Sequence, residues 1–529
     1  MKTQFYFLLI SASLSIFSAK AQTNFSGSLQ LQQNFFVLDS SVLSRPIPPQ
    51  YYKQLSSTDA WLDTRFEQNG FTVGARFDLF NNSNLRNPYN AYSAQGLGFW
   101  YITKPINDFE ITAGYFYEQF GSGIIFRAYE ARAQALDYGI QGIRAKYKYK
   151  NTTFKAFTGK QKQLFDTYLP IIKGVNVENF FSIGKQKNIN IAPCVGIVNR
   201  TLDQATMDII VSEINADTLK NRFVPKYNAY AYTLYNTITY KNFSWYAELA
   251  LKSPEAVLNT ANNKFENQRG RVFYTNLSYS KQGFGLTVQY KRTNHFDFRI
   301  APTQVLNNGL LGFIPPLSRF NTLPLTARYL PATQLVGEQG VQADVVLNVK
   351  QKHLINFNGS YINDLRGNAL YRELYIDDKF KINKNLKATV GLQHLVYNIA
   401  VYQFKPQAAN VRTITAFSEL TYKISRTNSI RAELSHLSTK QDFGSWAQAL
   451  LEFNIAPKYS FSVSDMYNYG NKLPDKRLHY YSIFGAANLG KTRLSAGYVR
   501  QVEGVNCTGG ICRLEPAFNG IKVGLSSRF

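Results

Sequence analysis

Apolar and polar residues alternate in short runs along nearly the whole chain. In residues 71–79 an apolar set, Phe71, Val73, Ala75, Phe77 and Leu79, alternates with Thr72, Gly74, Arg76 and Asp78. Residues 143–149, 243–249 and 284–291 repeat this pattern. A period of two places the two sets of side chains on opposite faces of a β-strand. The pattern therefore predicts many strands, each with one apolar and one polar face.

The connections between these runs alternate between short and long. Eleven short connections carry residues that suit tight hairpin turns, at Asn69-Gly70, Ile106-Asn107, Lys150-Asn151, Lys187-Asn188, Lys241-Asn242, Lys281-Gln282, Gln351-Lys352, Lys384-Asn385, Arg426-Thr427, Ala456-Pro457 and Gly490-Lys491. Twelve other connections lie between them, at 36–57, 81–95, 119–138, 161–176, 201–225, 253–269, 296–335, 364–369, 399–411, 439–443, 467–477 and 501–516. Together they predict about 24 strands, with a range of 20–26.

This rhythm predicts an all-β fold, a single large transmembrane antiparallel β-barrel. Outer-membrane barrels combine an even strand number with short periplasmic turns and long extracellular loops. Their apolar side chains face lipid and their charges face the lumen, because a charge at mid-membrane on the lipid face costs about 2–4 kcal/mol. The 35 Tyr and 39 Phe suit the aromatic girdles of such a barrel. The alternative is a secreted β-sandwich or β-propeller.

The two ends of the chain predict export and insertion. Residues 1–21 have the layout of a signal peptide, with Lys2, an apolar core and an Ala19-Lys20-Ala21 cleavage site. Residues 22–529 are then the barrel, and no lipoprotein anchor is expected because no Cys follows the site. The last strand alternates from Ala517 and stops on Phe529. Such an ending resembles the signal read by the barrel-assembly machinery, which predicts integral localisation in the outer membrane.

The chain is basic, with a formal net charge of +25. Lysines in turns and arginines on the lumen wall explain this excess. A more specific interpretation of the excess is a lumen that attracts anions, with a basic lining of Arg76, Arg144, Lys146 and Lys291. No basic block or recognition module indicates a nucleic-acid partner.

Residues 115–149 are the most unusual part of the chain. Charges of both signs are spread along this stretch, which suggests that residues 119–138 fold inward and constrict the lumen with paired charges. The charged residues are Glu118, Arg127, Glu130, Arg132, Asp137 and Arg144. An ordinary extracellular loop held by salt bridges explains the same residues. Both interpretations stay open.

The connection at 296–335 is long and apolar, with Leu310, Leu311, Phe313 and Leu317 beside several prolines. A segment this apolar is not expected to lie bare in water. It either fills the lumen, as wide barrels require, or docks a partner. The connection at 36–57 has a similar composition.

Little in the sequence indicates catalysis. The five His residues show no metal spacing or triad pattern, so we expect no enzyme, metal or cofactor. Cys507 and Cys512 bracket a short loop and are a candidate disulfide in an oxidising compartment. Cys194 is expected to be a free thiol on an apolar face.

The segment FYEQFGSGIIFRAYEARAQALDYGI, the signal cleavage site and the Phe-terminal strand resemble a Bacteroidota family of outer-membrane barrels of unassigned function. The resemblance spans the mature chain and implies fold and location but no activity. Bacteria of this group surround secretion and assembly machines with accessory barrels and surface lipoproteins.

Two classes of function follow. The first is a channel or transporter for polar or anionic solutes, with a lumen partly filled by loops. The second is a non-conducting scaffold that binds a lipoprotein or a component of a secretion or assembly complex. Outer-membrane lipid and the barrel-assembly machinery are expected partners of either.

Overall fold

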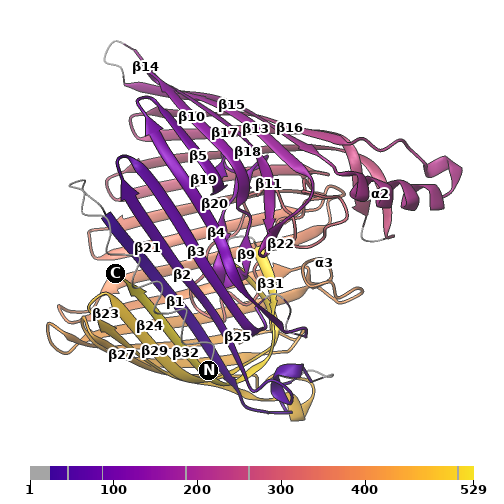
Figure 1. Cartoon of the computed structure of the whole chain (residues 1–529). Coiled ribbons are helices and arrows are strands. Elements are labelled where there is room, and N and C mark those ends of the chain that lie inside the picture. Colours follow the sequence, from indigo (N-terminus) through magenta and orange to yellow (C-terminus); the bar gives the residue numbers. More distant parts are fainter. Residues whose placement is uncertain are drawn as a thin grey trace, which may run out of the picture.

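The computed structural model describes residues 24–43, 47–85, 87, 89–184, 188–259, 262–508 and 511–529, apart from the side chains of Pro49 and of residues 505–514. These residues form one antiparallel sheet of 26 strands that closes on itself as a barrel (Figure 1). Setting aside the short strands β12 (Asp166–Thr167) and β14 (Phe181–Ile183) leaves 24 in the described chain. The predicted fold class and strand number are therefore confirmed. The predicted signal peptide lies outside the described residues and stays a prediction.

The first half of the wall contains thirteen of the long strands within the described residues. They are β1 (Asn24–Phe36), β2 (Ser56–Gln68), β3 (Phe71–Ser83), β4 (Tyr92–Ile106), β5 (Phe109–Phe116), β10 (Ile140–Tyr149), β11 (Thr152–Gln163), β13 (Ile171–Asn179), β15 (Ile189–Thr201), β16 (Asn228–Tyr240), β17 (Phe243–Asn259), β18 (Lys264–Lys281) and β19 (Phe284–Asn294). Each pairs with its neighbour in an antiparallel register, as β17 does with β18 from Phe243 opposite Tyr279 onward.

The second half of the wall contains the other eleven described strands. They are β20 (Gly337–Val349), β21 (His353–Asn363), β22 (Ala369–Lys381), β23 (Leu386–Tyr397), β24 (Val411–Lys423), β25 (Asn428–Ser438), β26 (Trp446–Ile455), β27 (Tyr459–Tyr467), β28 (His479–Leu489), β29 (Thr492–Gln501) and β32 (Phe518–Arg528). β32 pairs with β1 from Ser28 opposite Arg528 to Phe36 opposite Gly520, and this ladder closes the barrel.

Short turns gather at one end of the barrel and long connections at the other. We call these the short-turn end and the long-loop end. Asn69, Asn107, Lys150 and Lys241 adopt positive φ in the short turns, as tight hairpins require. The predicted connection at 253–269 is wrong in extent, because β17 and β18 continue to Asn259 and from Lys264. Their register shifts between Lys252 and Glu255, so the Ser-Pro sequence there marks a bulge rather than the end of a strand.

The long-loop end contains the remaining described elements. They are η2 (Pro49–Tyr51), β6 (Glu118–Gln119), β7 (Arg127–Ala128), β8 (Glu130–Ala131), η3 (Arg132–Gln134), β9 (Leu136–Asp137), α2 (Gln204–Ala216), η4 (Leu219–Asn221), α3 (Ile399–Tyr402), η5 (Pro474–Lys476), β30 (Gly504–Thr508) and β31 (Ile511–Glu515). Among the described helices, none is both long and apolar enough to cross a membrane.

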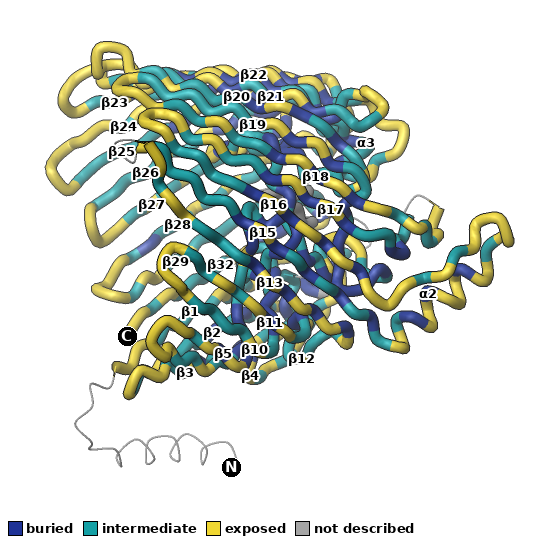
Figure 2. Tube along the Cα trace, turned by 90° about the horizontal axis from the view of Figure 1, so that it is seen from above, coloured by how far each residue is buried: buried dark blue, intermediate teal, exposed yellow. Residues whose placement is uncertain are grey.

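The two faces of the wall differ in polarity as the alternation predicts. Phe77 is exposed on the outer face, whereas its neighbours Arg76 and Asp78 are buried on the inner face. Trp245 and Glu248 of β17 show the same contrast. Figure 2 shows that buried residues concentrate in the half of the barrel nearest α2 and α3, while the short turns are exposed. The lumen is therefore filled mainly in its long-loop half.

Candidate functional site: the filled half of the lumen

Two connections enter the lumen and contact each other. We call residues 117–139 the first inserted segment and residues 295–336 the second. The backbone N–H of Arg127 donates to the carbonyl of Leu311 at 2.8 Å, and that of Phe313 donates to the carbonyl of Gly123 at 2.8 Å. A Cβ at Gly312 would lie 2.1 Å from the Ile124 carbonyl oxygen, so only glycine permits this approach. The two segments therefore form one body inside the barrel.

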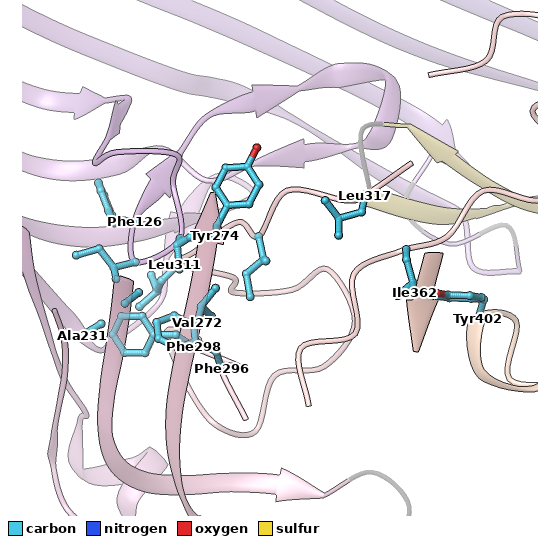
Figure 3. Close-up of a cluster of buried hydrophobic side chains, with 14 of the residues drawn as sticks. Phe126, Ala231, Val272, Tyr274, Phe296, Phe298, Leu311, Leu317, Ile362 and Tyr402 are labelled. Carbon is cyan, nitrogen blue, oxygen red and sulfur yellow. The ribbon is translucent and has the colours of Figure 1, made fainter. Parts of the chain in front are cut away.

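An apolar core joins this body to the inner wall (Figure 3). Phe126 of the first segment and Phe298 and Leu311 of the second are almost completely buried. Wall residues complete the same cluster, among them Ala231, Val272, Tyr274, Ile362, Tyr371, Leu395 and Trp446. These wall positions are inward-facing yet apolar, and they lie where the segments pack. Burial away from water provides the main stabilisation here, about 25 cal/mol per Å² of apolar surface.

A charged group fixes the first inserted segment to strands β2, β3 and β11. We call it the Arg76 cluster, made of Asp63, Arg76, Asp78, Glu130, Arg132, Asp137 and Lys162. The Arg76 guanidinium donates to Asp78 at 2.7 Å, to Glu130 at 2.7 Å and to Asp137 at 2.8 Å. Lys162 donates to Asp137 at 2.9 Å. Such charge-assisted hydrogen bonds are strong when water is excluded, and the Arg76 side chain is only 5% exposed.

Arg132 extends this cluster to the first wall strands. Its guanidinium donates to Glu130 at 2.7 Å and to Asp63 at 2.9 Å, and it also reaches Gln30 of β1 at 2.8 Å. The same group lies 5.4 Å from the ring centroid of Trp61. The first segment is thus attached to three neighbouring strands by side chains that it supplies itself.

A second charged group lies at the start of the first inserted segment. The Glu118 carboxylate is close to Arg144 at 3.5 Å, to Lys146 at 3.4 Å and to Lys155 at 3.5 Å. Arg144 also donates to Glu110 at 2.9 Å. Glu118 therefore balances several cations of β10 and β11.

Arg127 is held in a different way. Its guanidinium carbon lies 4.2 Å from the ring centroid of Phe313 and 4.3 Å from that of Tyr129. It therefore links the two inserted segments by cation–π contacts. Of the six predicted site residues, Glu130, Arg132 and Asp137 meet in one cluster, Glu118 and Arg144 in another, and Arg127 stands apart. Their predicted constricting role stays a prediction.

Polar contacts also anchor the second inserted segment. Lys291 of β19 pairs with Glu338 of β20 at 2.7 Å and donates to the Pro315 carbonyl at 2.6 Å. Ser122 of the first segment donates to Glu248 of β17. Further along, Asn321 donates to Glu373 at 3.1 Å. The polar contacts of the two segments thus extend along the wall from Gln30 of β1 to Glu373 of β22.

The four basic residues predicted to line an anion pathway are all neutralised. Arg76, Arg144, Lys146 and Lys291 each have a carboxylate within 4 Å. Their charges are therefore largely compensated inside the wall. A strong attraction for anions does not follow from these residues.

The first long connection is fixed against the closing strands. Arg500 of β29 donates to Asp39 at 2.8 Å, and the Tyr51 hydroxyl donates to the Ala517 carbonyl at 2.8 Å. Partial burial acts to raise the pKa of Asp39, but hydrogen bonds from Ser41 and Arg500 outweigh it and lower this pKa below its ordinary value. Asp39 is therefore a charged anchor at neutral pH.

The cysteines divide into two cases. Cys194 is a free, buried thiol, as predicted. Its expected position on an apolar face is wrong, because Cys194 borders a hollow that Glu178 and Tyr235 also line. The backbones of Cys507 and Cys512 lie opposite each other in the β30–β31 hairpin, but their side chains lie outside the described part of the chain. The disulfide stays a prediction.

The wall partners of the first segment were not among the predicted site residues. Asp63, Asp78 and Lys162 belong to the Arg76 cluster. The Glu248 carboxylate accepts a hydrogen bond from the Ser122 hydroxyl. Strand alternation places them on the inner face. No local pattern shows which of the many inward charges meets a segment tens of residues away.

The closed 24-strand wall of the described residues, with its apolar outer face and charged interior, defines an integral β-barrel of the outer-membrane type. The chain belongs to a family described as a family of unknown function, DUF6029, whose model matches residues 1–529. No curated protein matches the sequence.

Several solved barrels are similar to this chain at low sequence identity. The P pilus usher (PapC) translocation pore has 9% identity and a TM-score of 0.45, covering 96% of this chain and 99% of the usher. The siderophore receptor PirA from Pseudomonas aeruginosa has 8% identity and a TM-score of 0.42, covering 96% and 80%. The outer membrane protein opdK from Pseudomonas aeruginosa has 10% identity and a TM-score of 0.36, covering 83% and 99%. Such likeness carries no solute or partner to this chain.

Proposed function

We propose that this protein is a gated channel or transporter for polar solutes in the outer membrane, closed in the present conformation. The observation that carries this proposal is the Arg76 cluster, which attaches a chain segment to the wall by ionic contacts. Ionic contacts can exchange with water and with a solute, so the attachment is reversible in a way that a covalent link is not.

Hollows on both sides of this cluster suggest a route. A cavity of about 160 Å³ toward the long-loop end is bordered by Arg76, Glu130 and Arg132. A hollow of about 390 Å³ toward the short-turn end is bordered by Arg76 and Asp63. The cluster is the barrier between them. In the proposed open state, residues 130–137 move away from the wall. Their departure connects the two hollows into one path.

The charge balance sets the expected selectivity. Because the basic lining residues are paired with carboxylates, we expect only a weak preference for anions despite the net charge of +25. Uncharged polar solutes suit this lumen better than the anions that the composition alone suggests.

Single-channel recording in planar bilayers tests the proposal. We compare the wild type with the double variant Glu130→Gln/Arg132→Gln, which removes two charges of the cluster and keeps polar side chains at both positions. Arg426→Gln, in an exposed short turn, is the matched control. We expect rare or small openings in the wild type and the control, and frequent larger openings in the double variant. Silence of all three proteins, with folding shown by heat-modifiable gel mobility, would contradict gating at this cluster.

A second candidate function rests on the apolar core of the inserted body. Inward-facing Tyr371, Leu395 and Trp446 pack against the second segment, and a pore wall that contacts water has no need of them. This favours a non-conducting scaffold for a lipoprotein or a secretion or assembly component. Silent bilayers together with a stoichiometric partner after gentle purification would support it.

We also propose how the chain reaches the outer membrane and how it is oriented there. A signal peptide that is cleaved after Ala21 directs the chain across the inner membrane, and the barrel-assembly machinery reads β32 together with the terminal Phe529. The short-turn end then faces the periplasm and the long-loop end faces outward. We also retain a Bacteroidota origin as a proposal. Addition of a protease to intact cells tests the orientation, because cleavage is expected in the connection at 202–227.

A further inference from the structure

The cavity beside the Arg76 cluster has the lining of a ligand site. Wall residues Trp61, Phe80 and Tyr92, with Tyr138 of the first inserted segment and Tyr168 after β11, provide aromatic surfaces. Gln134, Gln163 and Asn308 provide amides. Ligand sites in proteins combine aromatic walls with a few fixed polar groups in this way.

The charges around this cavity already satisfy one another. Its three cations, Arg76, Arg132 and Lys162, are paired with Asp78, Glu130 and Asp137. A charged ligand would have to break one of these pairs and leave a buried charge without its partner. An uncharged ligand that both donates and accepts hydrogen bonds can use the remaining lone pairs and amides. The charge pattern therefore favours a neutral, hydroxyl-rich molecule.

The size and the aromatic lining narrow this class further. The cavity holds about 160 Å³. An engineered apolar cavity of about 150 Å³ accepts benzene, so the six-membered ring of a pyranose fits here, with its hydroxyl groups toward the open side of the cavity. The C–H faces of a pyranose carry a slight positive charge and pack against the negative faces of aromatic rings. Tyr92 and Tyr168 are only half-buried, which leaves part of each side chain open for contact.

We propose that this cavity binds a single pyranose unit of a neutral saccharide. The inference rests on the proposed function, for which it names the substrate class. A sugar seated here contacts Glu130, Arg132 and Asp137 directly.

Binding to the purified full-length chain in detergent tests the proposal without transport. Glucose, galactose, mannose and N-acetylglucosamine are titrated while tryptophan fluorescence is recorded, with glutamate and inorganic phosphate as charged comparators. Trp61→Phe shows whether the signal comes from the cavity. We expect saturable binding of at least one sugar with millimolar affinity, as suits a ligand of this size, and no saturation with the comparators.

Two substitutions separate this site from adventitious binding. Tyr92→Ala and Tyr168→Ala each remove an aromatic surface and are expected to weaken binding about three- to tenfold. Tyr230→Ala, on the exposed outer face of β16, is the matched control and is expected to bind as the wild type does. No saturable sugar binding, tighter binding of a charged comparator, or equal affinity in all three variants would overturn the proposal. Openings of the Glu130→Gln/Arg132→Gln channel would still occur if only the sugar site were wrong.

Discussion

Arg76 of β3 donates to Glu130 of the first inserted segment at 2.7 Å, although the two residues are 54 positions apart. The same guanidinium holds Asp78 on its own strand and Asp137 further along the segment. One wall side chain thus fixes both ends of residues 130–137. The stability of this segment in the lumen therefore depends on charges as well as on apolar packing.

Replacing Arg132 with Ala is expected to loosen the first inserted segment more than replacing Arg127 with Ala. Arg132 bonds to both Glu130 and Asp63, and a hydrogen bond to a charged group contributes about 1.5–3 kcal/mol. Glu130 keeps its contact with Arg76 after the substitution, so the loss falls mainly on Asp63 and on the attachment to β2. Arg127 loses cation–π contacts, worth about 0.5–2 kcal/mol. Uptake of a large antibiotic by cells that carry each variant measures the difference. Equal uptake in the two strains, at equal protein levels, would contradict this ranking.

Replacing Gly312 with Ala is expected to separate the two inserted segments. The new Cβ would lie 2.1 Å from the Ile124 carbonyl oxygen, so the backbones must move apart and the bond from Phe313 to Gly123 is strained. Overpacking of this kind costs about 1–3 kcal/mol. Gly285→Ala is the control, since a Cβ there would lie 3.8 Å from the Cβ of Val346, which is an ordinary van der Waals contact. Limited proteolysis in detergent should cleave residues 117–139 faster in Gly312→Ala alone.

The Lys291–Glu338 pair offers a test of wall stability. Both side chains are buried, at 0% and 1% exposure. Lys291→Met is expected to lower the free energy of unfolding by about 3–5 kcal/mol, because the buried Glu338 carboxylate then keeps only the backbone N–H of Gln334 as a donor. The double variant Lys291→Met/Glu338→Leu should recover part of that loss, since it removes the unpaired charge but leaves the Pro315 carbonyl and the Gln334 N–H without these partners. Urea unfolding in lipid vesicles measures both values, and a double variant as unstable as the single one would refute this account.

Cys507 and Cys512 are expected to form a disulfide in protein purified from native membranes. Their backbones are directly opposed in the β30–β31 hairpin. Mass spectrometry of the unreduced peptide that contains both residues should show a mass lower by two hydrogens than the reduced form. Alkylation of both thiols without prior reduction would contradict the pairing.

The strands and turns of the barrel could be predicted from local sequence patterns. The contacts that the inserted segments make inside the lumen could not. Alternation in residues such as 71–79 gives the faces of a strand, and turn residues such as Asn69 and Lys241 mark its ends. These signals act over a few residues. The contact from Ser122 to Glu248 spans 126 residues, and nothing near either position encodes it.

Helix α2 is an element that the sequence analysis did not predict, although its signal is local. Asp203 and Thr206 form a capping pattern, and Met207, Ile210 and Ile214 recur at helical spacing. The sequence therefore carried the signal for this helix. The regular strand rhythm, by contrast, predicts only an ordinary connection at 201–225, and the helix is absent from that prediction.

The N-cap of α2 predicts a dependence on pH. Asp203 accepts hydrogen bonds from the Thr206 backbone at 3.0 Å and from the Thr206 hydroxyl at 2.6 Å. Slight burial acts to raise the pKa of Asp203, but these bonds outweigh it and lower the pKa below its ordinary value of 3.8. A lowered pKa means that the cap stabilises the helix fully above pH 3.8 and loses this effect as the pH falls through the lower, folded-state value.

Hydrogen exchange of the α2 amides measures this dependence, expressed as protection relative to the unfolded rate at each pH. Protection should stay level from neutral pH to about pH 5 and fall below pH 3.8. Asp203→Ala should lower it about fivefold at neutral pH, as a lost cap of about 1 kcal/mol implies. Asp203→Asn keeps a capping side chain that does not titrate, so it should be protected at neutral pH and show no decrease in acid. If Asp203→Asn lost protection in acid as the wild type does, the titrating group would lie elsewhere, and Asp203 would be only one of several contacts that hold α2 against Leu202 and Ala256.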